Sequence, residues 1–155
     1  AGAYFLERSV LDLIPPGREV SIEREVFPRL VGDGLGAVRL DGYWMDIGTP
    51  ERYLQASWDI LENRVATQVR PSAPGLLIGA GAEVDPGASV GPRAVVSPGC
   101  RIGAGAQVRD SVLLDSCEVG AGASVSGSVL AAGVTVAAGA ELADAVVGRG
   151  ERVPA

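Results

Sequence analysis

Large aliphatic side chains recur every six residues through the middle of the chain. This row consists of Ile78, Val84, Val90, Val96, Ile102 and Val108. Neither the 3.6-residue period of an α-helix nor the two-residue period of an ordinary strand produces this spacing. A fixed period of six residues is typical of a hexapeptide β-helix, in which three short sides form one coil and successive coils stack.

A small or modest-sized apolar residue follows each aliphatic residue four positions later, which predicts a second inward-facing row. Its members are Ala82, Ala88, Ala94, Cys100, Ala106 and Val112. Beyond residue 108 the phase shifts once per coil, so that Val108, Val125 and Leu142 lie 17 residues apart. We therefore expect coils of three six-residue sides at first, and later coils that lose one residue at the same corner. Ser126 and Ser128 should point outward on either side of that corner.

The interior of such a stack is narrow, because small side chains line it between the aliphatic columns. Stacked coils pair their backbones about 4.8 Å apart, and Gly and Asp permit the sharp corners. Cys100 and Cys117 fall on the small row, one coil apart. They are either a metal or redox pair or two buried small side chains. We prefer burial, because a metal needs more ligands and the chain has no His.

Residues 119–140 form a stretch of 22 residues without a charge, which is long enough to cross a bilayer. The stretch contains five glycines and three serines, and its large aliphatic residues follow the repeat. We therefore interpret it as part of the β-helix and not as a membrane span.

The first seventy residues follow no six-residue period and are typical of mixed helices and strands. Pro and Gly residues separate the segments, and Ser21 is a suitable N-cap for a helix that Pro28 should disturb. The predicted elements are a strand over residues 1–6, a helical turn over 9–14, a helix after residue 21, and strands over 35–40 and 43–47.

The clearest local signal is the string that runs from Asp46 to Glu51, Asp-Ile-Gly-Thr-Pro-Glu. Thr49 is a suitable N-cap and Pro50 suits the first helical position, so we predict a helix from Pro50 to about Arg64. An Asp between a strand end and a helix N-terminus lies where α/β folds bind ligands, although spacing alone favours a turn-forming role. The residues that this helix should bury are Leu54, Trp58 and Leu61.

Composition narrows the possible chemistry. All 13 basic residues are Arg against 19 acidic residues, which gives a net charge of −6, and Lys and His are absent. The acidic balance argues against nucleic acid and anionic membranes as partners, and the missing His disfavours Ser-His and Cys-His nucleophilic sites. All seven aromatic residues lie before residue 59. Together with the repeat, this divides the chain into residues 1–70 and 71–155.

Several strings resemble the second half of the sugar-phosphate nucleotidyltransferases (NDP-sugar pyrophosphorylases), and mannose-1-phosphate guanylyltransferases in particular. The resemblance implies the α/β C-terminal portion of a Rossmann-like catalytic domain over residues 1–70 and a left-handed parallel β-helix over residues 71–155. The strings that carry it are Ala1-Gly-Ala-Tyr4, the segment from Gly17 to Leu30, Trp44-Met-Asp-Ile-Gly-Thr-Pro50, and Arg109-Asp-Ser-Val-Leu-Leu-Asp115.

Residue roles follow from this resemblance. In the family, a sugar-1-phosphate oxygen attacks the α-phosphate of a nucleoside triphosphate (GTP in the guanylyltransferases) and pyrophosphate leaves. Two Asp hold the Mg²⁺, and Asp46 matches the second of them, as catalytic residue and metal ligand. Gly2 and Tyr4 match the strand that lines the sugar pocket, and Trp44 is expected to pack behind Asp46. The phosphate loop and the first metal Asp belong to an N-terminal half that this sequence lacks, so the chain alone is expected to be inactive.

Other functions remain open at this point. Glucose-1-phosphate thymidylyl-, uridylyl- or adenylyltransferases share the same strings, and some relatives are non-catalytic scaffold or regulatory subunits. Hexapeptide β-helices also form acyltransferases, but those use a His that this chain lacks. No secretory signal pattern is present, and a cytoplasmic location is expected. The uncharged strand faces and open coil ends predict a homo-oligomer held partly through residues 71–155.

Overall fold

The computed structural model describes residues 3–39 and 41–155, which fall into two compact units divided between Gly42 and Tyr43. The first unit contains a 3₁₀-helix η1 (Arg8–Leu13), a π-helical turn η2 (Ile22–Val26) and a short α1 (Phe27–Leu30). The Ser21 side chain accepts a hydrogen bond from the Arg24 backbone N–H at 3.3 Å, which confirms the predicted cap. Pro28 lies in the first turn of α1, where its missing N–H costs nothing.

The strands predicted in the first seventy residues are wrong wherever the structure describes them. Residues 3–6, 35–39 and 43–47 belong to no strand, while residues 1, 2 and 40 lie outside the described residues. Strand propensity reflects how well a residue fits a pleated surface beside a partner strand, so it cannot form a strand by itself. No strand in the described part of the chain pairs with these segments.

The second unit begins with an extended segment that leads into helix α2 (Pro50–Leu61). The Thr49 hydroxyl accepts a hydrogen bond from the Arg52 N–H at 3.4 Å, and Pro50 occupies the first helical position, as the sequence predicts. Leu54 and Leu61 are buried, whereas Trp58 is only half-buried. The helix ends before Arg64 because Asn63 adopts a left-handed backbone with φ of 59°.

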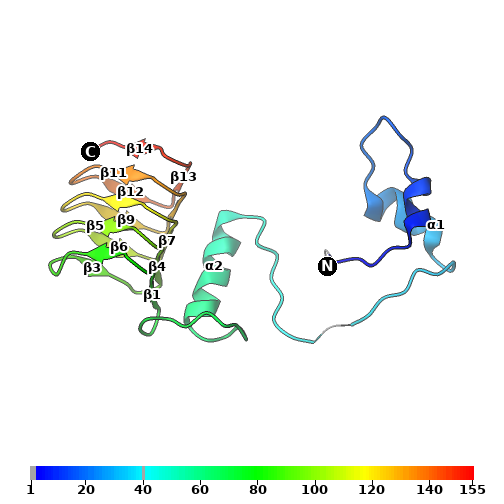
Figure 1. Ribbon diagram of the computed structural model, residues 1–155, viewed down its shortest axis with the longest axis horizontal. Helices are drawn as coiled ribbons and strands as arrows, with labels where there is room; N and C mark the ends of the chain where they lie inside the picture. The colour runs from blue at the N-terminus through cyan, green and yellow to red at the C-terminus, as the bar shows by residue number, and fades with distance from the viewer. Residues whose placement is uncertain (1–2, 40) are drawn as a thin grey trace. The chain divides into compact units, whose positions relative to one another are not determined.

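Residues 71–155 form a parallel β-helix, which confirms the predicted fold (Figure 1). Its coils contribute one strand each to three parallel sheets, with the orders β1-β4-β7-β10-β13, β14-β11-β8-β5-β2 and β12-β9-β6-β3. The strands are β1 (Leu76–Ile78), β2 (Glu83–Val84), β3 (Ser89–Val90), β4 (Ala94–Val96), β5 (Arg101–Ile102), β6 (Gln107–Arg109), β7 (Ser111–Leu113), β8 (Glu118–Val119), β9 (Ser124–Ser126), β10 (Val129–Leu130), β11 (Thr135–Val136), β12 (Glu141–Ala143), β13 (Val146–Val147) and β14 (Arg152–Val153).

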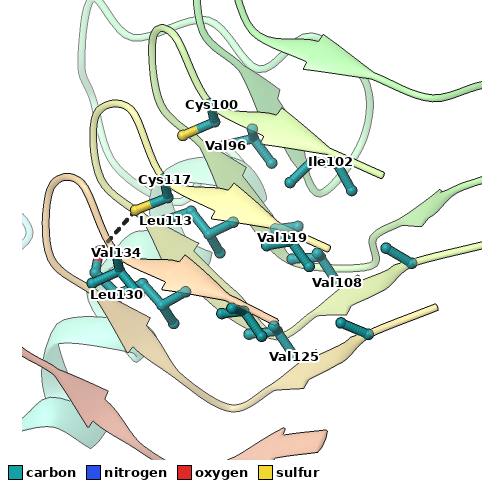
Figure 2. Packing of buried hydrophobic residues seen from close by; sticks show 14 of the residues in the cluster. Val96, Cys100, Ile102, Val108, Leu113, Cys117, Val119, Val125, Leu130 and Val134 are labelled. Atoms are coloured by element: carbon teal, nitrogen blue, oxygen red, sulfur yellow. Dashed lines mark hydrogen bonds between the residues drawn. The ribbon is translucent and has the colours of Figure 1, made fainter. Parts of the chain in front are cut away.

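The strand register confirms the two predicted coil lengths. Ile78 pairs with Val96, 18 residues later, and Val96 then pairs with Leu113, 17 residues later. The aliphatic row stacks in columns inside the coils, and Figure 2 shows Val96, Leu113 and Leu130 following one another along the stack. The uncharged stretch 119–140 lies within these coils, and none of the described helices has the length and apolar character needed to span a membrane.

The predicted position of the small row is wrong after the first shortened corner. Ser111 and Ser128 are fully buried and continue the inward row, whereas Val112 faces the other way and lies near α2. Each hydroxyl donates to the carbonyl oxygen two residues earlier at 2.7 Å. Ser111 Oγ accepts the N–H of Ser128, and Ser128 Oγ accepts the N–H of Ala145, both at 3.1 Å. The serines therefore satisfy backbone N–H groups at the corner that lost a residue, and Ser128 does not point outward as predicted.

Cys100 and Cys117 are free, fully buried, and stacked with Val134 in one column (Figure 2). Each Sγ lies 3.2 Å from a backbone carbonyl oxygen, that of Leu114 or Ala131. Contact with the Cys100 thiol and burial both raise the pKa of the Cys117 thiol. The described residues contain no group of three His, Cys, Asp or Glu that could hold a metal. This environment supports the interpretation of two buried small side chains.

Candidate functional site

Asp46 lies in the loop that leads into the N-terminus of α2. Its Oδ1 accepts a hydrogen bond from the Gly48 N–H at 2.9 Å, and its Oδ2 lies 3.6 Å from the Arg52 guanidinium. The carboxylate closes a turn onto its own backbone, which is the turn-forming role that spacing alone favoured. The side chain nevertheless remains 57% exposed, so Oδ2 keeps lone pairs that face solvent.

The Asp46 carboxylate approaches Gly48 closely. A Cβ placed on Gly48 would lie 3.1 Å from Asp46 Oδ1, so a larger residue would require the exposed carboxylate to shift by a few tenths of an ångström. Beyond the loop, Thr49 caps α2. The backbone N–H of Glu51 and, to a smaller extent, the Thr49 hydroxyl lower the pKa of the Glu51 carboxyl. The loop and α2 residues 47–50 also line a cavity of about 360 Å³ against the β-helix.

The resemblance implies Mg²⁺, and the described residues can supply only part of its coordination. Magnesium requires near-octahedral oxygen ligands, often one or two carboxylates together with phosphates and water. Asp46 offers one open carboxylate oxygen, and no cluster of three possible ligands exists among residues 3–39 and 41–155. Asp46 therefore fits a single ligand position, and the described chain does not form a complete metal site.

The resemblance also assigned roles to Gly2, Tyr4 and Trp44, and the structure describes the last two of them. Gly2 lies outside the described residues. Tyr4 belongs to the first unit, where its hydroxyl donates to a Glu23 carboxylate oxygen, which raises the pKa of Tyr4. Its ring meets Phe27 edge-on, with ring centroids 5.0 Å apart. Trp44 is 69% exposed, so the expectation that it packs behind Asp46 is wrong.

Sequence reasoning missed a buried carboxylate in α2, Asp59, which is only 5% exposed. Asp59 Oδ2 accepts a hydrogen bond from the Tyr43 hydroxyl at 2.7 Å. Its Oδ1 accepts one from Gln55 Nε2 at 2.8 Å and one from the Arg64 guanidinium at 3.1 Å. These donors, the Tyr43 hydroxyl first, lower the pKa of Asp59 against the opposing effect of burial. The available sequence signal was an acidic residue within α2 with a Gln four residues earlier and an Arg five residues later.

The pH dependence of stability should report this network. Because the pKa of Asp59 is lower in the folded than in the unfolded state, its carboxylate stabilises the fold at pH values above the ordinary Asp pKa. That contribution disappears as the pH falls through the pKa of the folded state. Between pH 7 and about pH 3, urea unfolding followed by circular dichroism should therefore show a smaller loss of stability for Asp59→Asn than for the wild type. Asp115→Asn, at an exposed corner, is the matched control and should retain the wild-type profile. Identical profiles for all three proteins would contradict the assignment.

A cation–π contact fixes α2 against a corner of the β-helix. The Arg93 guanidinium carbon lies 4.3 Å from the centroid of the Trp58 ring. Arg93 is itself held by Asp110 of the next coil, with Nε and Nη2 at 2.7 and 2.6 Å from Asp110 Oδ1. Because the guanidinium group is planar, Arg93 can stack on the aromatic ring and pair with the carboxylate at the same time. The β-helix therefore provides the base on which α2 and its N-terminal loop rest.

Comparison with known proteins matches the two regions of the chain to two family models. The family described as GMPPB C-terminal domain matches residues 73–154, and the family described as nucleotidyl transferase matches residues 1–63. A mannose-1-phosphate guanylyltransferase of Mycobacterium tuberculosis is 39% identical over 109 residues, which cover 56% of this chain and 30% of that protein. A mannose-1-phosphate guanyltransferase of Schizosaccharomyces pombe is 42% identical over 84 residues, which cover 54% of this chain and 22% of that protein.

A plant relative gives the same result. A probable mannose-1-phosphate guanylyltransferase of Oryza sativa is 45% identical over 85 residues, which cover 54% of this chain and 22% of that protein. The chain thus spans less than a third of the length of these relatives. Because the match over residues 73–154 covers more than half of the chain, this protein belongs to the GMPPB C-terminal domain family, with a nucleotidyl transferase segment in front of its β-helix.

Proposed function

We propose that this chain is part of an enzyme that forms GDP-mannose from GTP and mannose-1-phosphate and releases pyrophosphate. The observation that carries the proposal is that relatives from a bacterium, a yeast and a plant, all matched over more than half of this chain, bear guanylyltransferase names. The nucleotidyl transferase match over residues 1–63 supports an active-site segment in this chain, which contains Asp46, Gly2 and Tyr4.

In the proposed reaction, an oxygen of the sugar-1-phosphate forms a bond to the α-phosphorus of GTP, and the bond to the β-phosphate oxygen breaks. Bound Mg²⁺ would neutralise charge on the approaching phosphates. Asp46 would supply one carboxylate oxygen to that ion from its exposed Oδ2, while its Oδ1 stays on the Gly48 N–H. Gly2 and Tyr4 would contribute to the sugar pocket. The turn thus fixes the carboxylate before substrate arrives, which lowers the cost of orientation.

A second candidate function is a non-catalytic subunit of the same family, and one observation favours it. Asp85, at a β-helix corner, makes the same turn as Asp46, with Oδ1 accepting the Gly87 N–H at 2.8 Å. A turn of this kind therefore needs no catalytic role. In that case the exposed oxygen of Asp46 binds no metal ion. The function of the chain would then be that of a scaffold formed by the β-helix.

We also propose that the enzyme is a homo-oligomer with part of its interface in residues 71–155. Two features support this. Val146 on the outer face of the sheet formed by β1, β4, β7, β10 and β13 is 63% exposed. A broad hollow of about 910 Å³ lies over the sheet that contains β5 and β8.

Pyrophosphate release from GTP and mannose-1-phosphate tests the proposed reaction. We expect turnover by a longer protein that joins this chain to the remaining length found in its relatives, and none by residues 1–155 alone. The expected difference is several powers of ten, because the described residues offer one metal-ligand position, Asp46 Oδ2, and the resemblance places the phosphate loop in the remaining length. Turnover by residues 1–155 alone would refute the division of the active site. A longer protein that binds but never turns over these substrates would favour the scaffold function.

A further inference from the structure

The segment that carries Asp46 has little support from its own backbone. Residues 43–48 belong to no helix or strand, and they make no backbone–backbone hydrogen bond with any other described residue. Within the segment, Trp44, Asp46 and Ile47 are exposed, and only Met45 is half-buried. Among the described residues, side-chain contacts and not backbone pairing therefore hold the segment that carries Asp46.

The side-chain contacts identify one anchor, the Tyr43 hydroxyl. It donates to the buried Asp59 Oδ2 at 2.7 Å and lies 3.6 Å from the sulfur of Met45, the neighbour of Asp46. Asp59 is held in turn by Gln55 and Arg64, so its carboxylate cannot rotate away without losing three hydrogen bonds. A buried carboxylate with all its donors in place is a rigid point of attachment.

The same helix fixes both ends of the segment. Tyr43 is held at the C-terminal half of α2 through Asp59, and Asp46 Oδ2 lies 3.6 Å from Arg52 in the first turn of α2. Helix α2 in turn rests on the β-helix through Trp58 and Arg93. The segment therefore spans α2 between two anchors, and its orientation depends on both.

We propose that Asp59 is a positioning residue that acts through Tyr43 to hold residues 43–48, and with them the Asp46 carboxylate, in place for the reaction. The proposal rests on the proposed function of Asp46 and adds Asp59, Tyr43 and Met45 to the residues on which that function depends. It assigns no contact with substrate to these residues.

Fluorine NMR of protein labelled with 5-fluorotryptophan gives a readout that does not depend on activity. The chain has two tryptophans, Trp44 on the segment and Trp58 on α2, so the second signal is an internal control. In Tyr43→Phe, transverse relaxation of the Trp44 signal should slow about twofold as the segment gains motion, while the Trp58 signal stays unchanged. Asp59→Ala should have the same effect on Trp44. Tyr53→Phe, which alters a tyrosine on α2 without a side-chain hydrogen bond among the described residues, should change neither signal.

Unchanged relaxation of Trp44 in Tyr43→Phe would overturn the proposal. A change in both tryptophan signals in Tyr43→Phe would also overturn it, because the network would then support α2 and not the segment. In the longer enzyme, Tyr43→Phe should raise the magnesium concentration for half-maximal rate roughly tenfold and leave the KM for the sugar phosphate unchanged. If Trp44 is released but Asp46→Asn retains full activity, the anchor exists and the proposed role of Asp46 has failed. Failure of the Tyr43–Asp59 anchor and failure of the proposed role of Asp46 therefore give different results.

Discussion

Asp46→Asn in the longer enzyme should leave the fold intact and reduce turnover by roughly 10²–10³-fold, the effect of removing one group that stabilises charge in a transition state. The structure makes this substitution a selective one. Oδ1 of Asn can still accept the Gly48 N–H that Asp46 Oδ1 accepts at 2.9 Å, so the turn survives. Only the charge and the exposed oxygen near Arg52 are lost.

The matched control is Asp85→Asn in the β-helix. Asp85 makes the same turn, with the Gly87 N–H at 2.8 Å, but lies at a corner with no proposed catalytic role. We expect Asp85→Asn to retain the wild-type rate and magnesium dependence, measured as pyrophosphate release. If Asp46→Asn behaves like Asp85→Asn, Asp46 is a turn-forming residue and the scaffold function is favoured.

Ala106→Phe should destabilise the β-helix by about 3 kcal/mol, at the upper end of the cost of overpacking. Ala106 is fully buried, and its carbonyl and that of Ala123 accept backbone N–H groups from adjacent coils, so the coils cannot separate to admit a ring. Thermal unfolding followed by circular dichroism should show a melting temperature lower by roughly 10 °C.

Ala104→Phe is the control for this substitution. Ala104 is exposed at the corner between β5 and β6, two residues from Ala106, so a ring there meets solvent. Its melting temperature should lie within about 2 °C of the wild type, as for most surface substitutions. Equal melting temperatures for the two variants would show that the assignment of inward positions is wrong.

The sequence alone determined the β-helix because its code is local and repeated. Each six-residue side requires one large inward residue, one small inward residue and a corner that tolerates a turn. The same requirements repeat in every coil. The Thr49 cap and the Pro50 start of α2 were predictable for the same reason, since the groups that interact are within three residues of each other.

Tertiary structure decided where the shortened corner places its side chains. Ser111 and Val112 are adjacent, and either could fill a small inward position. The choice depends on the hydrogen bond that Ser111 Oγ accepts from the Ser128 N–H in the next coil, which no local pattern contains. Ser128 Oγ accepts the Ala145 N–H in the same way one coil later. An unpaired backbone N–H inside the coil is costly, so the residue that can accept a hydrogen bond turns inward.

The candidate site shows the same division between local and distant information. The string around Asp46 identified the loop and its turn, because Asp46 and Gly48 are two residues apart. The strand expected at residues 43–47 did not form, since a strand requires a partner and the described chain offers none there. The anchor that replaces it joins Tyr43 to Asp59 across 16 positions. Only the fold brings these two side chains together, because residues 43–48 must turn back along α2 for the Tyr43 hydroxyl to reach the buried Asp59 carboxylate.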